Sequence, residues 1–206
     1  YKEMDSYING KKQPNNTGIT TATIKRCMPV FDSITAGYII TSVADLWVTK
    51  KDGEPYYEWS ALDLISFHNN IQAPYYPLNN RPSGYPVMSY PKWQNYWAIK
   101  TPKGYSTLFT QPLHRESVFT ILPGIVDTDV YTAPVNFPFT INDPNFEGLI
   151  PKGTPIAQVI PIKRDNWKMS FGKEKDVVQQ HTLTQKLQTV FFDRYKRMFR
   201  QEKSYK

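Results

Sequence analysis

Cysteine and histidine are scarce in this sequence. Its 206 residues include one cysteine, Cys27, and three histidines, His68, His114 and His181. A single cysteine excludes an internal disulfide framework, and its apolar sequence context predicts a buried, inert thiol rather than a nucleophile. The histidines lie too far apart to match the ligand spacing of a zinc site. The sequence therefore predicts neither a metal site nor thiol chemistry.

Long hydrophobic runs are also missing. No apolar segment reaches the length needed to cross a bilayer, and no charged segment is followed by the apolar stretch of a signal peptide. We therefore expect no membrane partner and a cytoplasmic location.

Glycine is scarce as well, with 10 residues against 17 prolines. Aromatic residues, in contrast, make up 15% of the chain and apolar residues 40%, which is typical of a folded globular protein. This balance favours short strands joined by stiff loops over a helical bundle. The length predicts one domain with appendages.

Between residues 97 and 163, short apolar segments alternate with turn signals. The turns are Thr101–Gly104, Pro123-Gly124, Asn142–Asn145 and Pro151–Thr154. The segments between them read as strands at 97–100, 105–110, 118–122, 135–141, 149–150 and 156–162. Turn chemistry at such regular intervals predicts a mainly β fold, a small β-barrel or sandwich.

The region before this core predicts a hairpin. Residues 30–34 are compatible with one helical turn, and residues 36–40 with a strand. Residues 44–49 and 55–59 read as two further strands around Asp52-Gly53, which is a strong hairpin-turn signal. We expect a hairpin from residue 39 to residue 59.

The chain as a whole divides into three predicted segments. Residues 1–23 are polar and read as an N-terminal arm that needs a partner to become ordered. Residues 24–163 form the β domain, with its core at 97–163. Residues 164–206 form a linker and a C-terminal basic helix.

The predicted helix starts near Asp176, after which proline and glycine are absent. Its apolar residues follow a spacing of three and four and predict packing on the β domain or on a neighbouring subunit. The helix end supplies much of the net charge of +7. Because cations are favoured at a helix C-terminus, we prefer a solvated basic end there over a nucleic-acid interface.

Residues 73–97 interleave proline with tyrosine and tryptophan. Such a segment suits an aromatic platform for bases or sugars. It suits equally a stiff loop packed over the domain by its own rings. Because few cations lie nearby in the sequence, the packed loop is the preferred interpretation.

Four motifs of the core occur in an order that resembles a known superfamily. They are Pro102–Tyr105 (PKGY), Arg115-Glu116-Ser117, Pro123–Tyr131 (PGIVDTDVY) and Ile150–Ile160 (IPKGTPIAQVI). This order resembles the dUTPase and dCTP-deaminase superfamily, whose fold is of the β-clip type. The resemblance covers about a third of the chain.

The resemblance implies a set of site residues. Asp127 is similar to the catalytic carboxylate that activates water, and Tyr131 to the tyrosine that packs on the deoxyribose. Arg115 and Ser117 are similar to the phosphate contacts, and Gln158 to the motif glutamine. The family also implies a deoxynucleoside triphosphate as substrate, Mg²⁺ held by that triphosphate, and a homotrimer with sites at subunit boundaries.

Departures from the family pattern keep a second interpretation open. Val130 is inserted before Tyr131, Pro155 replaces a motif arginine, and the glycine-rich C-terminal arm is missing. These changes favour a non-catalytic β-clip protein that serves in oligomerisation or as a virion structural or decoration protein. The chain also resembles phage-encoded proteins of unassigned role, and if it is phage-encoded we expect it in the virion rather than the cytoplasm. Asp127 and Asp129 are equally compatible with capping backbone N–H groups after the Pro-Gly turn.

Overall fold

The structure, a computed structural model, describes residues 13–14, 20–21, 27–60, 65–69, 89–189 and 194–205. The chain divides into two compact units. The larger unit is Gly37–Arg164, and the smaller unit combines Tyr1–Ala36 with Asp165–Lys206. The described residues are mainly β, and their strands pair antiparallel. This confirms the predicted mainly β fold.

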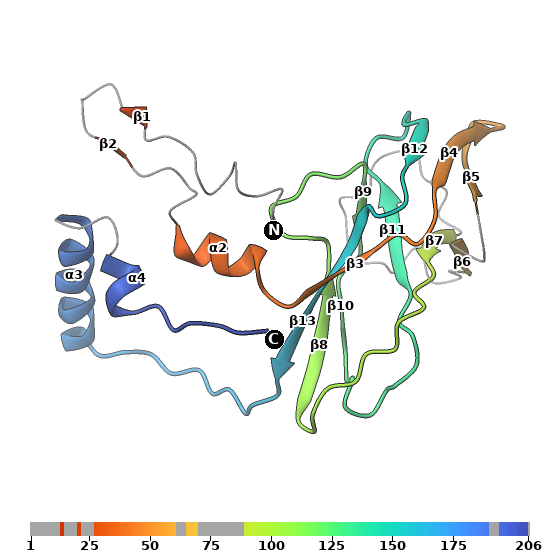
Figure 1. The fold of residues 1–206 in the computed structure, drawn as a ribbon. Coiled ribbons are helices and arrows are strands. Elements are labelled where there is room, and N and C mark those ends of the chain that lie inside the picture. Colours follow the sequence, from red (N-terminus) through yellow and green to blue (C-terminus); the bar gives the residue numbers. More distant parts are fainter. Residues whose placement is uncertain are drawn as a thin grey trace. The chain divides into compact units, whose positions relative to one another are not determined.

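The described strands of the larger unit form three sheets, with the orders β10-β8-β13-β3, β6-β7-β11-β9 and β12-β4-β5 (Figure 1). None of these sheets closes into a barrel within the described residues. The strands are β3 (Tyr38–Thr41), β4 (Leu46–Lys51), β5 (Glu54–Trp59), β6 (Ile65–Asn69), β7 (Ser89–Trp93), β8 (Tyr105–Thr110), β9 (Phe119–Ile121), β10 (Gly124–Val126), β11 (Phe137–Ile141), β12 (Gly148–Ile150) and β13 (Pro155–Lys163).

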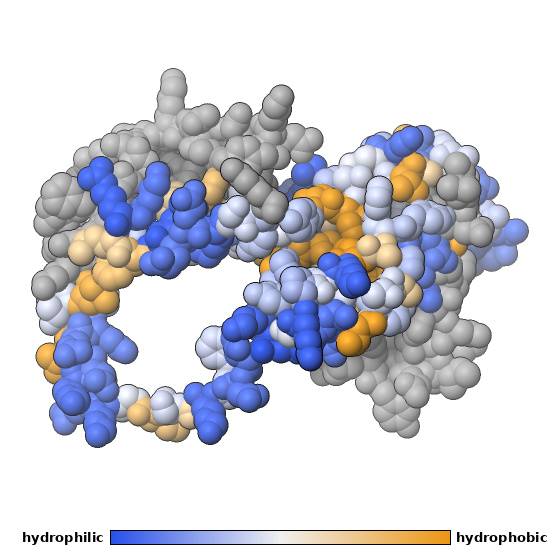
Figure 2. All heavy atoms as spheres, turned by 60° about the horizontal axis from the view of Figure 1, so that its bottom comes forward, coloured by the Kyte–Doolittle hydropathy of each residue, from blue (hydrophilic) through white to orange (hydrophobic). Residues whose placement is uncertain are grey.

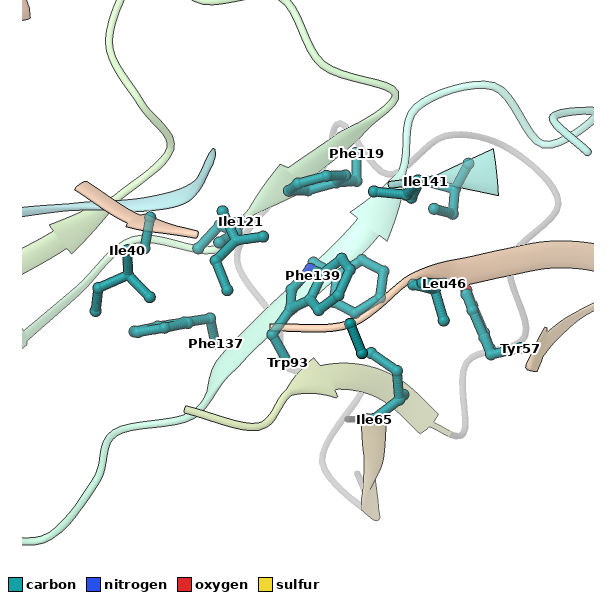
Figure 3. Packing of buried hydrophobic residues seen from close by; sticks show 14 of the residues in the cluster. Ile40, Leu46, Tyr57, Ile65, Trp93, Phe119, Ile121, Phe137, Phe139 and Ile141 are labelled. Carbon is teal, nitrogen blue, oxygen red and sulfur yellow. The ribbon is translucent and has the colours of Figure 1, made fainter. Parts of the chain in front are cut away.

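Aromatic rings fill the centre of the larger unit. Phe137, Phe139 and Ile141 alternate along β11 and are buried, whereas the residues between them are half-buried. The indole of Trp93 on β7 stacks on Phe139 with ring centroids 5.2 Å apart, and Phe119 on β9 lies 5.4 Å from Trp93 (Figure 3). Such pairs stabilise a core beyond the burial of their area. The core therefore joins β7, β9 and β11.

Several predicted elements are confirmed. The strand predicted at 105–110 is β8, with the same bounds, and the hairpin turn at Asp52-Gly53 joins β4 to β5. The predicted start of that hairpin was wrong, because β3 pairs with β13 instead. The strand predicted at 97–100 was also wrong, since residues 94–100 form no strand.

The strand β7 was missed because it contains Pro91. Proline lacks an N–H group, which argues against a strand inside a sheet. In the structure Pro91 lies outside the ladder between β7 and β11, which uses only Lys92 and Trp93, and stands opposite Phe67 in the ladder between β7 and β6. The rest of the Pro/Tyr-rich segment, residues 73–88, lies outside the described residues.

The described elements of the smaller unit are β1 (Gln13–Pro14), β2 (Thr20–Thr21), α2 (Met28–Ile34), α3 (Glu174–Thr189) and α4 (Arg194–Met198). The predicted start of a helix near residue 176 is confirmed by α3, but the predicted basic helix end was wrong, because residues 199–205 are not helical and Arg200 and Lys203 pair with Asp32. Apart from β1 and β2, the predicted arm at 1–23 lies outside the described residues. No helix in the described ranges combines the length and apolar character needed to span a bilayer.

The buried thiol predicted at Cys27 was wrong. Cys27 is exposed, because it precedes the first turn of α2 rather than entering a packed strand. The side chain of this helix that is buried is Asp32. The Asp32 carboxylate accepts hydrogen bonds from Arg200 and Lys203, which lie beyond α4 in the sequence.

Candidate functional site

The site begins at the turn that follows β10. The backbone N–H groups of Val130 and Tyr131 donate to the carbonyl oxygen of Asp127, at 3.1 and 2.8 Å. This tight turn sets the two aspartates in different surroundings. The side chain of Asp127 is 62% exposed, whereas that of Asp129 is only 4% exposed. The two carboxylates therefore cannot have the same role.

Asp129 is the carboxylate that caps a backbone group. Its Oδ2 accepts the N–H of Gly104 at 2.9 Å, and Gly104 has the positive φ of 87° that glycine adopts readily. Both Asp129 oxygens also accept from the guanidinium of Arg164. The backbone N–H of Arg164 in turn donates to the carbonyl oxygen of Gly104 at 2.8 Å. The PKGY turn is thus bound to Asp129 and Arg164 together.

Asp127 is held by side chains alone. Its Oδ1 accepts from Ser106 Oγ at 2.6 Å and from Arg164 Nη1 at 3.1 Å. Among the described residues no group donates to its other oxygen, Oδ2, which belongs to an exposed side chain. A carboxylate with one oxygen fixed and the other open to solvent can orient a water molecule.

Arg164 determines the electrostatics of the cluster. Its guanidinium and the N–H of Gly104 lower the pKa of Asp129 below the ordinary value, because both favour the charged form. The same pairing, mainly with Asp129, raises the pKa of Arg164. Asp129 and Arg164 therefore remain ionised at neutral pH as a charged pair.

A chain of hydroxyl groups lies beneath the turn. Thr128 Oγ1 is 2.8 Å from Thr101 Oγ1 and 2.7 Å from Thr107 Oγ1. Thr107 and Thr128 are almost fully buried, so these hydrogen bonds satisfy polar groups that water cannot reach. These hydrogen-bonded hydroxyl groups fix the turn to β8.

The residues predicted to bind phosphate lie in a separate loop, between β8 and β9. Arg115 and Ser117 belong to this loop, and Asn142 Nδ2 donates to the carbonyl oxygen of Ser117 at 2.8 Å. Gln158 is only 1% exposed, and its Oε1 accepts the N–H of Leu113 at 2.9 Å. Gln158 therefore holds the loop from beneath and leaves no surface for a ligand.

The two groups of predicted residues occupy opposite ends of β8. Asp127 is bonded to Ser106, whereas Gln158 pairs with Thr110 at the end that leads into the loop. Ser106 and Thr110 are four residue steps apart along the strand, about 13 Å at the usual rise. Within one copy of the chain, Asp127 and Tyr131 therefore lie close together, and Gln158 lies close to the loop of Arg115 and Ser117. The two groups do not meet at one site.

Tyr131 directly follows the turn and is 47% exposed, beside the more exposed Val130. The described residues contain no group of three or more His, Cys, Asp or Glu side chains that could hold a metal ion. An Mg²⁺ ion at Asp127 would need its other ligands from a bound triphosphate and water.

Three residues of this cluster were not among the predicted site residues. Ser106, Gly104 and Arg164 form most of its hydrogen bonds, yet Arg164 follows the last strand with no motif around it. The one signal for Arg164 is its position directly after β13, whose last residue, Lys163, pairs with Tyr105 at the beginning of β8. The comparisons with known proteins add no assignment. No protein-family model matches this chain, and no curated protein matches it either.

Proposed function

We propose that this protein binds a deoxynucleoside triphosphate and hydrolyses it in the manner of a dUTPase, on a fold of the β-clip type. Asp127 takes a proton from a water molecule, and the water oxygen attacks the α-phosphorus. The bond between the α-phosphorus and its bridging oxygen breaks, so pyrophosphate leaves and a deoxynucleoside monophosphate remains. Mg²⁺ would be held by the triphosphate itself and would offset the charge of the phosphates.

The observation that supports this proposal is the geometry of Asp127. Its Oδ1 is fixed by Ser106 and Arg164 while its side chain is 62% exposed. An aspartate that only capped the turn would bind backbone N–H groups, and Asp129 already does so. The exposed ring of Tyr131 stands one turn away and could pack on a deoxyribose.

The proposed oligomer is a homotrimer. Within one copy, Asp127 lies at one end of β8 and the loop of Arg115 and Ser117 at the other. A neighbouring copy in a closed ring can bring its own loop to this copy's Asp127. The loop then supplies the cation for the phosphates, and Gln158 keeps the loop in place.

A thermal-shift titration with each deoxynucleoside triphosphate, with and without Mg²⁺, tests the proposal. One nucleotide should raise the melting temperature, because a ligand that binds the folded state stabilises it. Hydrolysis of that nucleotide, followed by pyrophosphate release, should fall at least about 100-fold in Asp127→Asn. The matched control is Asp52→Asn, at a hairpin tip with a φ of 53° that asparagine tolerates. Its activity should equal that of the unmodified protein.

A non-catalytic oligomerisation module is the second candidate. It is favoured by the outer face of the first sheet, where Ile125, Leu108 and Ile160 are direct neighbours across β10, β8 and β13. Ile125 is exposed, and Figure 2 shows hydrophobic atoms gathered on the surface that these strands occupy. Exposed apolar patches of this kind mark contact surfaces. A trimer by light scattering that responds to no nucleotide would establish this function and refute the first.

A further inference from the structure

Arg164 has more side-chain partners than any other residue of the Asp127 cluster. Its Nη1 lies within 3.1 Å of Asp127 Oδ1, Asp129 Oδ1, Ser106 Oγ and the carbonyl oxygen of Tyr105. Its Nη2 donates to Asp129 Oδ2. A planar guanidinium with this many acceptors has one available orientation, because its donors form a rigid fork.

We propose that Arg164 is the positioning residue of the catalytic Asp127, an inference that rests on the proposed function. Arg164 and Ser106 both donate to Oδ1 of Asp127, from two directions. Two hydrogen bonds to one oxygen fix the rotation of the carboxylate and direct Oδ2 toward solvent. Arg164 itself does not touch the substrate. It determines where the oxygen that accepts the proton lies.

Asp129 completes this device as the counter-ion of Arg164. Without it, the guanidinium would neutralise Asp127 and hold it in a closed pair. Asp129 is buried and accepts hydrogen bonds from both terminal nitrogens of the guanidinium, so Asp129 already offsets the positive charge of Arg164. Asp129 rather than Asp127 is thus the main ionic partner of Arg164. The two aspartates of the DTD turn thus have separate roles, one as anchor and one as base.

The position of Arg164 in the chain makes the arrangement rigid. The backbone N–H of Arg164 donates to the carbonyl oxygen of Gly104, and the N–H of Gly104 donates to Asp129. The turn of PKGY therefore fixes both ends of the ion pair. Preorganisation of this kind is worth most in the catalytic step, since small displacements of a reacting group are costly.

The test compares two arginine substitutions in the full-length chain, Arg164→Gln and Arg115→Gln, with the triphosphate that the unmodified protein hydrolyses. A positioning residue acts in the transition state, so Arg164→Gln should lower kcat about 100-fold and change KM less than about twofold. Arg115→Gln, in the proposed phosphate loop, should instead raise KM with a smaller change in kcat. Arg164→Lys should recover part of kcat, because an ammonium can reach Asp127 but lacks the fork that binds Asp129.

The outcomes separate this inference from the proposed function. An unmodified protein without turnover would overturn both. Turnover in the unmodified protein with an unchanged kcat in Arg164→Gln would overturn the positioning role alone. A fall in melting temperature in Arg164→Gln is compatible with either role, so Arg164→Lys decides in that case. A lysine variant with the melting temperature of the unmodified protein and no recovery of kcat over the glutamine variant would also overturn it.

Discussion

The two units of this chain are stabilised by different forces. All the described apolar side chains that are fully buried belong to the larger unit, Gly37–Arg164. In the described part of the smaller unit the one buried side chain is Asp32, a charged residue. The first arrangement draws on the hydrophobic effect and the second on ion pairing. The proposed site lies in the unit with the apolar core, where a rigid sheet can position Asp127.

This comparison predicts opposite results for two tryptophans. Trp93 is fully buried among Phe119 and Phe139, whereas Trp167, in the smaller unit, is 89% exposed. Trp93→Ala should lower the free energy of unfolding by about 4 kcal/mol, because it removes buried area and leaves a cavity. Trp167→Ala should change it by less than about 0.5 kcal/mol. Urea unfolding of both variants measures the difference. Equal losses of unfolding free energy would refute the claim that only the larger unit is stabilised by an apolar core.

Two glycines of the larger unit provide a second pair. Gly37 has a φ of 66°, and a Cβ atom there would lie 1.8 Å from the backbone carbonyl oxygen of Val159. Gly153 has a φ of 86°, and a Cβ atom there meets nothing within 4 Å. Gly37→Ala should therefore cost about 3 kcal/mol of unfolding free energy, from strain and a clash with backbone. Gly153→Ala should lower the unfolding free energy by only about 1 kcal/mol, because it introduces backbone strain without a clash.

Denaturant unfolding of the two alanine variants measures these costs. The larger loss in Gly37→Ala should reflect separation of β3 from β13, since Val159 pairs with Tyr38 across that ladder. Comparable losses in both variants would show that the close approach of Gly37 to β13 contributes nothing.

Local signals predicted much of the fold. The hairpin β4–β5 follows from Asp52-Gly53, and β8 from the glycine turn before it. The sequence could not show that β3 leaves this hairpin for β13, because the partner is more than a hundred residues away. The burial of Gln158 was hidden for a related reason. Residues 156–159 are all buried, next to an irregularity in the pairing of β13, so the alternation typical of a strand is lost.

The site was predictable only in part. The motif pointed to Asp127, and the structure gives this residue an exposed carboxylate with one oxygen fixed. The sequence left Asp127 and Asp129 equivalent, because the difference between them depends on Gly104 and Arg164, far away in the chain. Local sequence patterns identify turns and strands, whereas charge partners are determined by the pairing of distant strands.

The third comparison lies in the smaller unit, where two arginines near the C-terminus allow a matched pair of substitutions. Arg200 donates to both oxygens of Asp32, at 2.7 to 3.2 Å, while Arg197 on α4 is exposed. Arg200→Gln leaves Asp32 with Lys203 and should destabilise the smaller unit, by less than the loss of a fully buried ion pair because Lys203 is half-exposed. Arg197→Gln should cost almost nothing.

The pH dependence of this ion pair sharpens the comparison between the units. Hydrogen bonds from Arg200 lower the pKa of Asp32 below its ordinary value of 3.8, against the opposing effect of burial. The stabilisation is therefore complete above pH 3.8 and is lost as the pH falls through the lowered pKa. Arg200→Gln removes the largest cause of that lowering, so the folded and unfolded pKa values should lie closer together and the acid-dependent loss of stability should become smaller. Amide exchange of residues 199–205 measures it, and an identical acid profile in Arg200→Gln and Arg197→Gln would show that the pair does not stabilise the unit.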